Sequence, residues 1–247
     1  MRSANLYNPY EGKAYARQLK ETIEEFLQRL PPLTTPATDN GPWIRIANPH
    51  SPKRPLQEDL AGLTAAGSKI LSDFSARKAE IETEMTGRPK STMARKVTEE
   101  RKTVEEALLA AAVENDCTSG KWMLFPMPED LAHTWRLVAT ATARNELGTA
   151  AKVGADEGKS NRVPRLVCVY TRDFSDMEDV KRVLLKLVEM DLVQRPARDP
   201  KGVRSIYYKC SMYPLSALLI LLLLSCDTTL TKRCVRCLHS PRHQLWQ

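Results

Sequence analysis

The sequence is short of the residues that catalytic sites use most. It holds only 4 histidines in 247 residues, and it has neither a glycine-rich phosphate loop nor a recognisable nucleophile motif. His133 stands two residues before Trp135 on a predicted helix, where a structural or exposed position is far more common than a general base. We therefore expect a protein that is not an enzyme, with no catalytic residues and no cofactor.

Signals for secretion and for membrane insertion are also missing. Residues 1–8 contain no apolar stretch of the kind that a signal peptide needs. The 6 cysteines indicate a reducing compartment rather than a disulfide scaffold. The longest apolar run, residues 215–225, is well below the ~20 residues that span a bilayer as a helix. We expect a cytoplasmic or nuclear protein without a stable membrane span.

The positive charge is unevenly distributed along the chain. The net charge is +7, and residues 205–247 contribute +4 of it, from five lysines and arginines against Asp227 alone. The rest of the chain carries only +3, which is ordinary for a soluble domain. Charge by itself therefore gives no strong indication of nucleic-acid binding.

The clearest pattern of secondary structure lies in residues 120–187. A short apolar run at 121–125 predicts a buried strand. From Pro128, apolar residues recur at helical spacing up to Gly148. Residues 165–171 are rich in β-branched and aromatic side chains and predict a second strand. Ser175 and Glu178 have the spacing of a capping box, which predicts a second helix from there.

The N-terminal half is less regular. Residues 13–30 predict an amphipathic helix, residues 31–41 a turn-rich linker and residues 43–47 a half-buried strand. Helical spacing is also present in the apolar residues of 60–74 and 104–112, and short strands are predicted at 148–153 and 205–210. The segment 76–102 carries many charges of both signs and is interpreted either as a mobile insertion or as ordinary solvated helices.

The domain boundaries follow from these elements. We expect an N-terminal helix and linker over residues 1–40, and an α+β domain over 41–212 with a charged helical insertion around 75–103. Residues 213–247 form an atypical apolar and basic tail.

Several segments of the central block resemble a eukaryotic family of uncharacterised function, that of the basophilic-leukaemia-expressed protein. The resemblance is good over about residues 116–210 and is carried by residues 119–126, Trp135, Gly148, 151–153, 167–171 and Asp176. It implies a fold like that of the translation initiation factor 4E. That fold is a curved antiparallel sheet with helices packed on one face, and Trp122, Trp135 and Tyr170 are then expected in the core.

The same resemblance allows a comparison with the cap-binding site of factor 4E. That factor stacks a methylated guanine between two tryptophans and pairs the base with a glutamate. The corresponding position here is residues 109–113, Leu-Ala-Ala-Ala-Val, which contain no aromatic residue. We therefore expect the base-stacking sandwich to be absent.

The phosphate-binding region of factor 4E has a clearer counterpart. The resemblance implies that basic residues in and after the strand predicted at 148–153 bind phosphates of RNA or of a nucleotide. The candidates are Lys152, Lys159, Arg162 and Arg165. The alternative is an exposed basic loop that is balanced by Asp156 and Glu157.

The tail differs from everything before it. Our hypothesis is that residues 213–247 are a gene-model artefact, from a retained intron or a frameshift, and replace the last strand of the domain. A tail anchor before Lys232 is too short. Zinc binding around Cys234 is disfavoured because a single residue separates Cys237 from His239. We expect no metal site, and the leucine run is more typical of an aggregation-prone segment.

Two functions remain after these exclusions. The first is a non-enzymatic protein that binds RNA or nucleotide phosphates through a basic loop. The alternative is a protein-interaction adaptor that uses its helical face. The sequence does not determine the oligomeric state.

Overall fold

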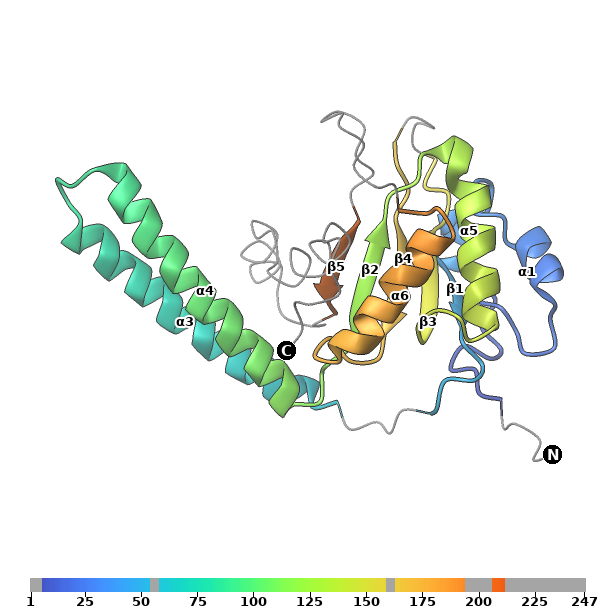
Figure 1. Cartoon of the computed structure of the whole chain (residues 1–247), viewed down its shortest axis with the longest axis horizontal. Coiled ribbons are helices and arrows are strands. Elements are labelled where there is room, and N and C mark those ends of the chain that lie inside the picture. Colours follow the sequence, from blue (N-terminus) through green and yellow to red (C-terminus); the bar gives the residue numbers. More distant parts are fainter. Residues whose placement is uncertain (1–5, 54–57, 159–162, 194–205, 212–247) are drawn as a thin grey trace. The chain divides into compact units, whose positions relative to one another are not determined.

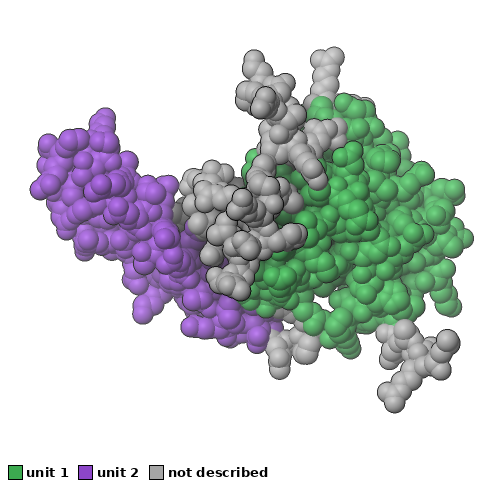
Figure 2. Space-filling model, viewed as in Figure 1, with its two compact units in different colours: residues 1–54, 119–210, 230–247 green, residues 55–118, 211–229 purple. Residues whose placement is uncertain are grey.

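The computed structural model describes residues 6–53, 58–158, 163–193 and 206–211. These residues form two compact units, which are shown in different colours in Figure 2. The sheet unit contains the described residues up to 53 and those from 119 to 210. The hairpin unit contains residues 58–118. Lys159, Arg162 and the predictions for residues 213–247 lie outside the described ranges.

The sheet unit is an α+β structure built on an open antiparallel sheet. Its strands are β1 Trp43–Ala47, β2 Gly120–Leu124, β3 Ala150–Gly154, β4 Val167–Thr171 and β5 Tyr207–Cys210. They are arranged in the order β1-β3-β4-β2-β5, and every neighbouring pair is antiparallel. The strands that were predicted from the sequence therefore join into a single sheet.

Alternation along the strands separates apolar from polar side chains, because successive residues of a strand point to opposite faces. Cross-strand register then places one row of mostly apolar residues on a common face: Ile46, Ala151, Val169, Trp122 and Tyr208. All of these side chains are essentially buried. This apolar face is the one that packs against helices.

The helices of the sheet unit are α1 Ile23–Arg29, α2 Ala37–Asn40, α5 Pro128–Ala143 and α6 Met177–Glu189. Helices α5 and α6 lie over the same face of the sheet (Figure 1). The indole Nε1 of Trp122 donates a hydrogen bond to the backbone oxygen of Val180 in α6, at 3.1 Å. Trp135 of α5 packs edge-on against Phe26 of α1, with ring centroids 6.2 Å apart. Trp122 and Trp135 are both fully buried, so each joins a helix to the core.

Tyr208 holds the edge strand β5 to the rest of the sheet. Its hydroxyl is hydrogen-bonded to the Thr171 hydroxyl at 2.6 Å, and its ring packs on Trp122 at 4.9 Å between centroids. Residue 120 must be glycine for this arrangement, because a Cβ there would lie 2.1 Å from the Tyr208 hydroxyl oxygen. Gly120 thus makes room for the side chain that docks β5.

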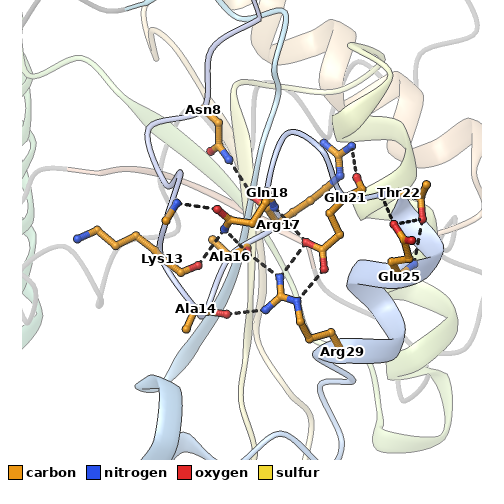
Figure 3. Close-up of polar contacts among 11 residues, drawn as sticks. Asn8, Lys13, Ala14, Ala16, Arg17, Gln18, Glu21, Thr22, Glu25 and Arg29 are labelled. Carbon is orange, nitrogen blue, oxygen red and sulfur yellow. Dashed lines mark hydrogen bonds and ion pairs between the residues drawn. The ribbon is translucent and has the colours of Figure 1, made fainter.

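The N-terminal segment differs from its prediction. Helix α1 covers only the last part of the predicted helix 13–30. Residues 15–17 instead run beside β1, where Arg45 bonds through its backbone to Tyr15 and Arg17. Arg29 holds this extended segment by pairing with the Glu21 carboxylate and donating to the backbone oxygens of residues 14 and 16 (Figure 3). Pairing with the sheet edge and this side-chain network outweighed the local helical pattern.

Helix α6 also begins differently from the prediction. The side chain of Asp176 caps it by accepting from the backbone N–H of Asp179. The Ser175 hydroxyl donates to the carboxylate of Asp173 instead of acting as the cap. The predicted capping box is therefore wrong by one residue, although a helix does follow it.

The hairpin unit consists of two long helices, α3 Leu60–Glu84 and α4 Lys90–Glu114. A turn with a left-handed Gly87 and with Pro89 joins them. Their buried seam is made of apolar and small residues: Leu63, Gly67, Leu71, Phe74, Ile81, Val104, Leu108, Ala111 and Ala112. The segment around 75–103 is therefore the tip of a helical hairpin whose charges lie on solvated faces. No helix in the described part of the chain has both the length and the apolar character of a membrane span.

Candidate functional site

The second face of the sheet collects positively charged side chains. We call it the basic face and define it by the strand residues in register with Arg45 and Lys121: Trp43, Arg45, Ala47, Lys121, Met123, Ala150, Lys152, Gly154, Cys168, Tyr170, Tyr207 and Lys209. Four of these residues are cations and none is acidic. The charged side chains among these strand residues are therefore all positive, which favours the approach of an anion.

Strand register places these cations opposite one another. Arg45 of β1 pairs directly with Lys152 of β3, and Lys121 of β2 pairs directly with Lys209 of β5. Residues that face each other in an antiparallel pair have their Cβ atoms about 4.5–5.5 Å apart, and like charges at such positions are destabilising. Strand register therefore places two pairs of cations opposite one another on one surface.

Two aromatic rings accompany Lys152. Its Nζ lies 3.7 Å from the centroid of the Trp43 ring and 5.9 Å from that of Tyr170. The guanidinium carbon of Arg45 lies 5.6 Å from the centroid of Tyr10. An aromatic ring attracts a cation through the negative potential of its face. These rings partly replace the carboxylate that a buried lysine ordinarily has as a partner.

The protonation of Lys152 reflects these surroundings. Its side chain is only 4% exposed, and burial lowers its pKa from 10.5 to about 8, with Lys121 and Arg45 also lowering it and Cys168 opposing them. Burial likewise lowers the pKa of Lys209, again helped by Lys121. Within the described residues, no carboxylate shifts the pKa of either lysine. An anion bound here would supply the missing negative charge.

Cys168 lies directly opposite Lys152 in the sheet. It is completely buried, and burial raises the pKa of its thiol despite the nearby cations. Because its pKa is raised, the thiol is in its neutral form at physiological pH. Its buried position is typical of a free cysteine that packs as a small apolar residue.

The predicted phosphate-binding residues differ in their surroundings. Lys152 lies on the basic face. Arg165 pairs with the carboxylate of Asp156 at 2.7 Å and also donates to the backbone oxygen of Ala155. Its side chain is only 15% exposed, so its guanidinium already has an acidic partner within the protein. Lys159 and Arg162 fall outside the described residues.

Sequence reasoning missed Arg45, Lys121 and Lys209. The signal was present in each strand, since each of these cations stands next to a residue that the core buries: Ile44, Trp122 and Tyr208. What the sequence did not reveal is which strands are neighbours and in what register. Only this pairing brings the separate cations to one face.

Tyr170 also differs from its prediction. It was expected in the core beside Trp122 and Trp135, but its side chain is half-buried and belongs to the basic face. The reason is the alternation along β4, where Val167, Val169 and Thr171 take the inward positions. The described residues contain no group of three or more histidine, cysteine or acidic side chains placed to hold a metal ion.

Comparison with known proteins places the chain in a family. A family model described as basophilic leukemia-expressed protein Bles03 matches residues 1–215. No curated protein matches the chain. Because the match covers most of the 247 residues, the chain belongs to the Bles03 family, as the motifs around Trp122, Gly148 and Tyr170 suggested.

Proposed function

We propose that this member of the Bles03 family is a non-enzymatic protein that binds the phosphates of RNA or of a nucleotide on the basic face of its sheet. The observation that supports this most is the set of four strand cations, Arg45, Lys121, Lys152 and Lys209, without an acidic residue among them. The proposal keeps Lys152 from the sequence prediction and moves the centre of the site from the loop to the sheet.

Placing these cations together on one face costs free energy. Like charges in register repel, and burial of Lys152 disfavours its charged form. A bound phosphate would reverse both effects, because it lies close to several cations and accepts charge-assisted hydrogen bonds from them. Phosphate contacts of this kind need no particular base sequence.

The fold resemblance is compatible with this location. A factor-4E-like protein would bind its ligand on the sheet face that carries no helices, and an antiparallel sheet with α5 and α6 on the other face has the required layers. The segment where factor 4E carries base-stacking residues corresponds here to 109–113, which lies inside α4. We therefore propose phosphate recognition that does not depend on a cap.

The test is a fluorescence-polarisation titration of the full chain with capped and uncapped RNA oligonucleotides. We expect equal affinities for the two, with a loss of roughly tenfold or more between about 50 and 200 mM salt as bound counterions compete. Tighter binding of the capped RNA would show a base-specific site and contradict cap independence. No binding of either RNA at low salt would refute the proposed function.

A protein-interaction role for the hairpin unit is the second candidate. Leu60 and Val113 are 41% and 47% exposed. They lie at the same end of the hairpin, since the backbone of Asp59 bonds to that of Asn115. Two exposed apolar side chains at one end of a helical pair could contact a partner helix. Such binding would change little with salt, which distinguishes it from phosphate recognition.

A further inference from the structure

The basic face carries aromatic rings among its cations, and this combination restricts the kind of ligand. Trp43 and Tyr170 flank Lys152, and Tyr207 lies at the other end of the same surface. Phosphate binding alone would need no rings. We infer that the ligand is single-stranded RNA, with a base stacked on Trp43 and its phosphates on the neighbouring cations. This inference rests on the proposed function and adds the ligand class to it.

The rings are placed where a base could reach them. Trp43 and Tyr170 are both half-buried, so each ring is anchored in the sheet and yet leaves part of its surface accessible. Tyr207 is 41% exposed. Stacking of bases on aromatic side chains is the common way in which proteins hold single strands without reading their sequence. The rings therefore add affinity that a phosphate contact does not supply.

Lys152 links the two kinds of contact. In the structure its ammonium lies against the Trp43 ring at 3.7 Å from the centroid. A base that stacks on this ring would compete with the ammonium for the aromatic surface. The phosphate of the same nucleotide would offer the displaced ammonium a stronger, oppositely charged partner. One nucleotide could therefore replace the contact between Lys152 and Trp43 with two new contacts: its base on the ring and its phosphate on the ammonium.

The extent of the basic face argues for a strand rather than for a single nucleotide. The cations lie on β1, β3, β2 and β5, and the sheet order makes β1 and β5 its two edges. Four strand spacings of ~4.8 Å give ~19 Å from one edge to the other. A single phosphate cannot contact cations over this distance, whereas successive phosphates of one chain can. Arg45 and Lys209 at the edges are then both used.

A double helix does not suit this surface. In duplex RNA the bases are stacked inside the helix and their faces are not available to side chains. A duplex could contact the cations, but its bases could not stack on the rings. We therefore expect single-stranded RNA to bind more tightly than a duplex of the same length.

The experiment compares two probes of equal charge. A short fluorescein-labelled adenosine oligonucleotide and an abasic oligonucleotide of the same length are titrated with the full wild-type chain at low salt. We expect the adenosine probe to bind about tenfold or more tightly, as stacking of a base typically provides. The duplex probe should bind more weakly than the adenosine single strand.

A variant then locates the stacking. Trp43→Ala should lower the affinity for the adenosine probe to that for the abasic probe, while the abasic affinity changes less than about twofold. Tyr7→Ala, which removes a half-buried ring outside the strands of the sheet, is the matched control. Circular dichroism of both variants shows whether the fold is kept. If Trp43→Ala does not fold, the wild-type comparison of the probes still decides.

The outcomes separate the two proposals. Equal, salt-sensitive affinity for the adenosine and abasic probes would overturn base stacking and leave phosphate binding in place. A duplex that binds as tightly as the single strand would overturn the assignment of single-stranded RNA. If none of the probes binds at low salt, the proposed function fails together with this inference.

Discussion

The basic face and the hairpin unit both contain lysines and arginines, but the neighbours of these cations differ. On the hairpin, cations have acidic partners along one helix or across the pair: Arg77 with Glu80 and Glu84, Lys78 with Glu82, Lys96 with Glu84, Arg95 with Glu99, and Lys102 with Glu106. On the basic face, Arg45 and Lys121 are in register with Lys152 and Lys209. The first arrangement pairs cations with acids, and the second places cations opposite one another across the strands.

This contrast shows why net charge is a poor guide to function here. The total of +7 would be the same if the cations were spread evenly over the surface. Hairpin cations contribute solubility and a small helix stabilisation, whereas sheet cations create a local positive potential. The difference between the two groups of cations comes from the pairing of residues across strands, which composition does not record.

The largest effect is expected from neutralising the basic face. The triple substitution Arg45→Gln, Lys121→Gln and Lys209→Gln removes three half-buried cations. It should weaken binding of single-stranded RNA by about 100-fold or more at moderate salt, because each cation contributes a phosphate contact. Fluorescence polarisation measures this.

The matched control makes the same charge change on the hairpin. Lys78→Gln, Arg95→Gln and Lys102→Gln also remove three positive charges, from side chains that are paired with acids in the structure. We expect RNA affinity within about twofold of wild type, since these residues lie outside the basic face. A loss equal to that of the sheet variant would mean that net charge alone governs binding.

The next predictions concern stability and compare a buried lysine of the basic face with an exposed lysine of the hairpin. Lys152→Met should raise the free energy of unfolding at pH 7 by about 1–3 kcal/mol, because it removes the cost of charging a buried amine next to Arg45 and Lys121. Urea denaturation checks this. A destabilisation would show that the contact with Trp43 outweighs the cost of burial.

The lowered pKa of Lys152 should also make the stability of the protein depend on pH. This pKa is about 8 in the folded chain and near 10.5 when unfolded, so between these values the unfolded state binds more protons. Stability of the wild-type chain should therefore rise as the pH increases from about 8 to about 10.5. The rise should be smaller in Lys152→Met, as denaturation at several pH values would show. Identical pH profiles for the two proteins would exclude Lys152 as the cause.

A much smaller effect is expected for a paired lysine on the hairpin. Lys102→Gln removes the exposed pair with Glu106, whose atoms are 3.8 Å apart. Exposed pairs of this kind contribute about 0.3–0.5 kcal/mol, so the denaturation midpoint should fall only slightly. A loss above about 1 kcal/mol would indicate that the hairpin charges form a more tightly coupled network than separate ion pairs.

The smallest effect on RNA binding should come from removing the hairpin altogether. Residues 60–114 can be replaced by a short glycine-serine loop, since the backbone of Asp59 bonds to that of Asn115 and the ends of the hairpin are therefore close together. RNA affinity should stay within about twofold of wild type, as polarisation would measure. A loss of binding would assign part of the site to the hairpin unit.

Much of the fold could be predicted because its signals are local. The strands at 120–124 and 167–171 are short apolar runs between turn residues, and α5 follows directly from Pro128. The helix predicted over 13–30 was mostly wrong, because Ala16 pairs with the edge of the sheet and Arg29 holds that segment in place. Contacts between distant residues decided the structure there.

The candidate site could be predicted only in part, for the same reason. Lys152 was found through a family resemblance. Lys121 and Lys209 were missed because they come together only when β5 pairs with β2, and the sequence does not specify this register. Tyr170 was assigned to the core because an aromatic residue in a strand is more often buried, whereas alternation along β4 placed it beside Lys152.

The most direct test is the salt dependence of single-stranded RNA binding. It is measured for the wild-type chain and for the triple variant Arg45→Gln, Lys121→Gln and Lys209→Gln. Single-stranded RNA releases about 0.7 counterions for each phosphate that a cation neutralises. We predict that the slope of log affinity against log salt falls by about two in the variant, because three cations are removed. An unchanged slope would contradict this prediction, because the basic face would then not be where the phosphates bind.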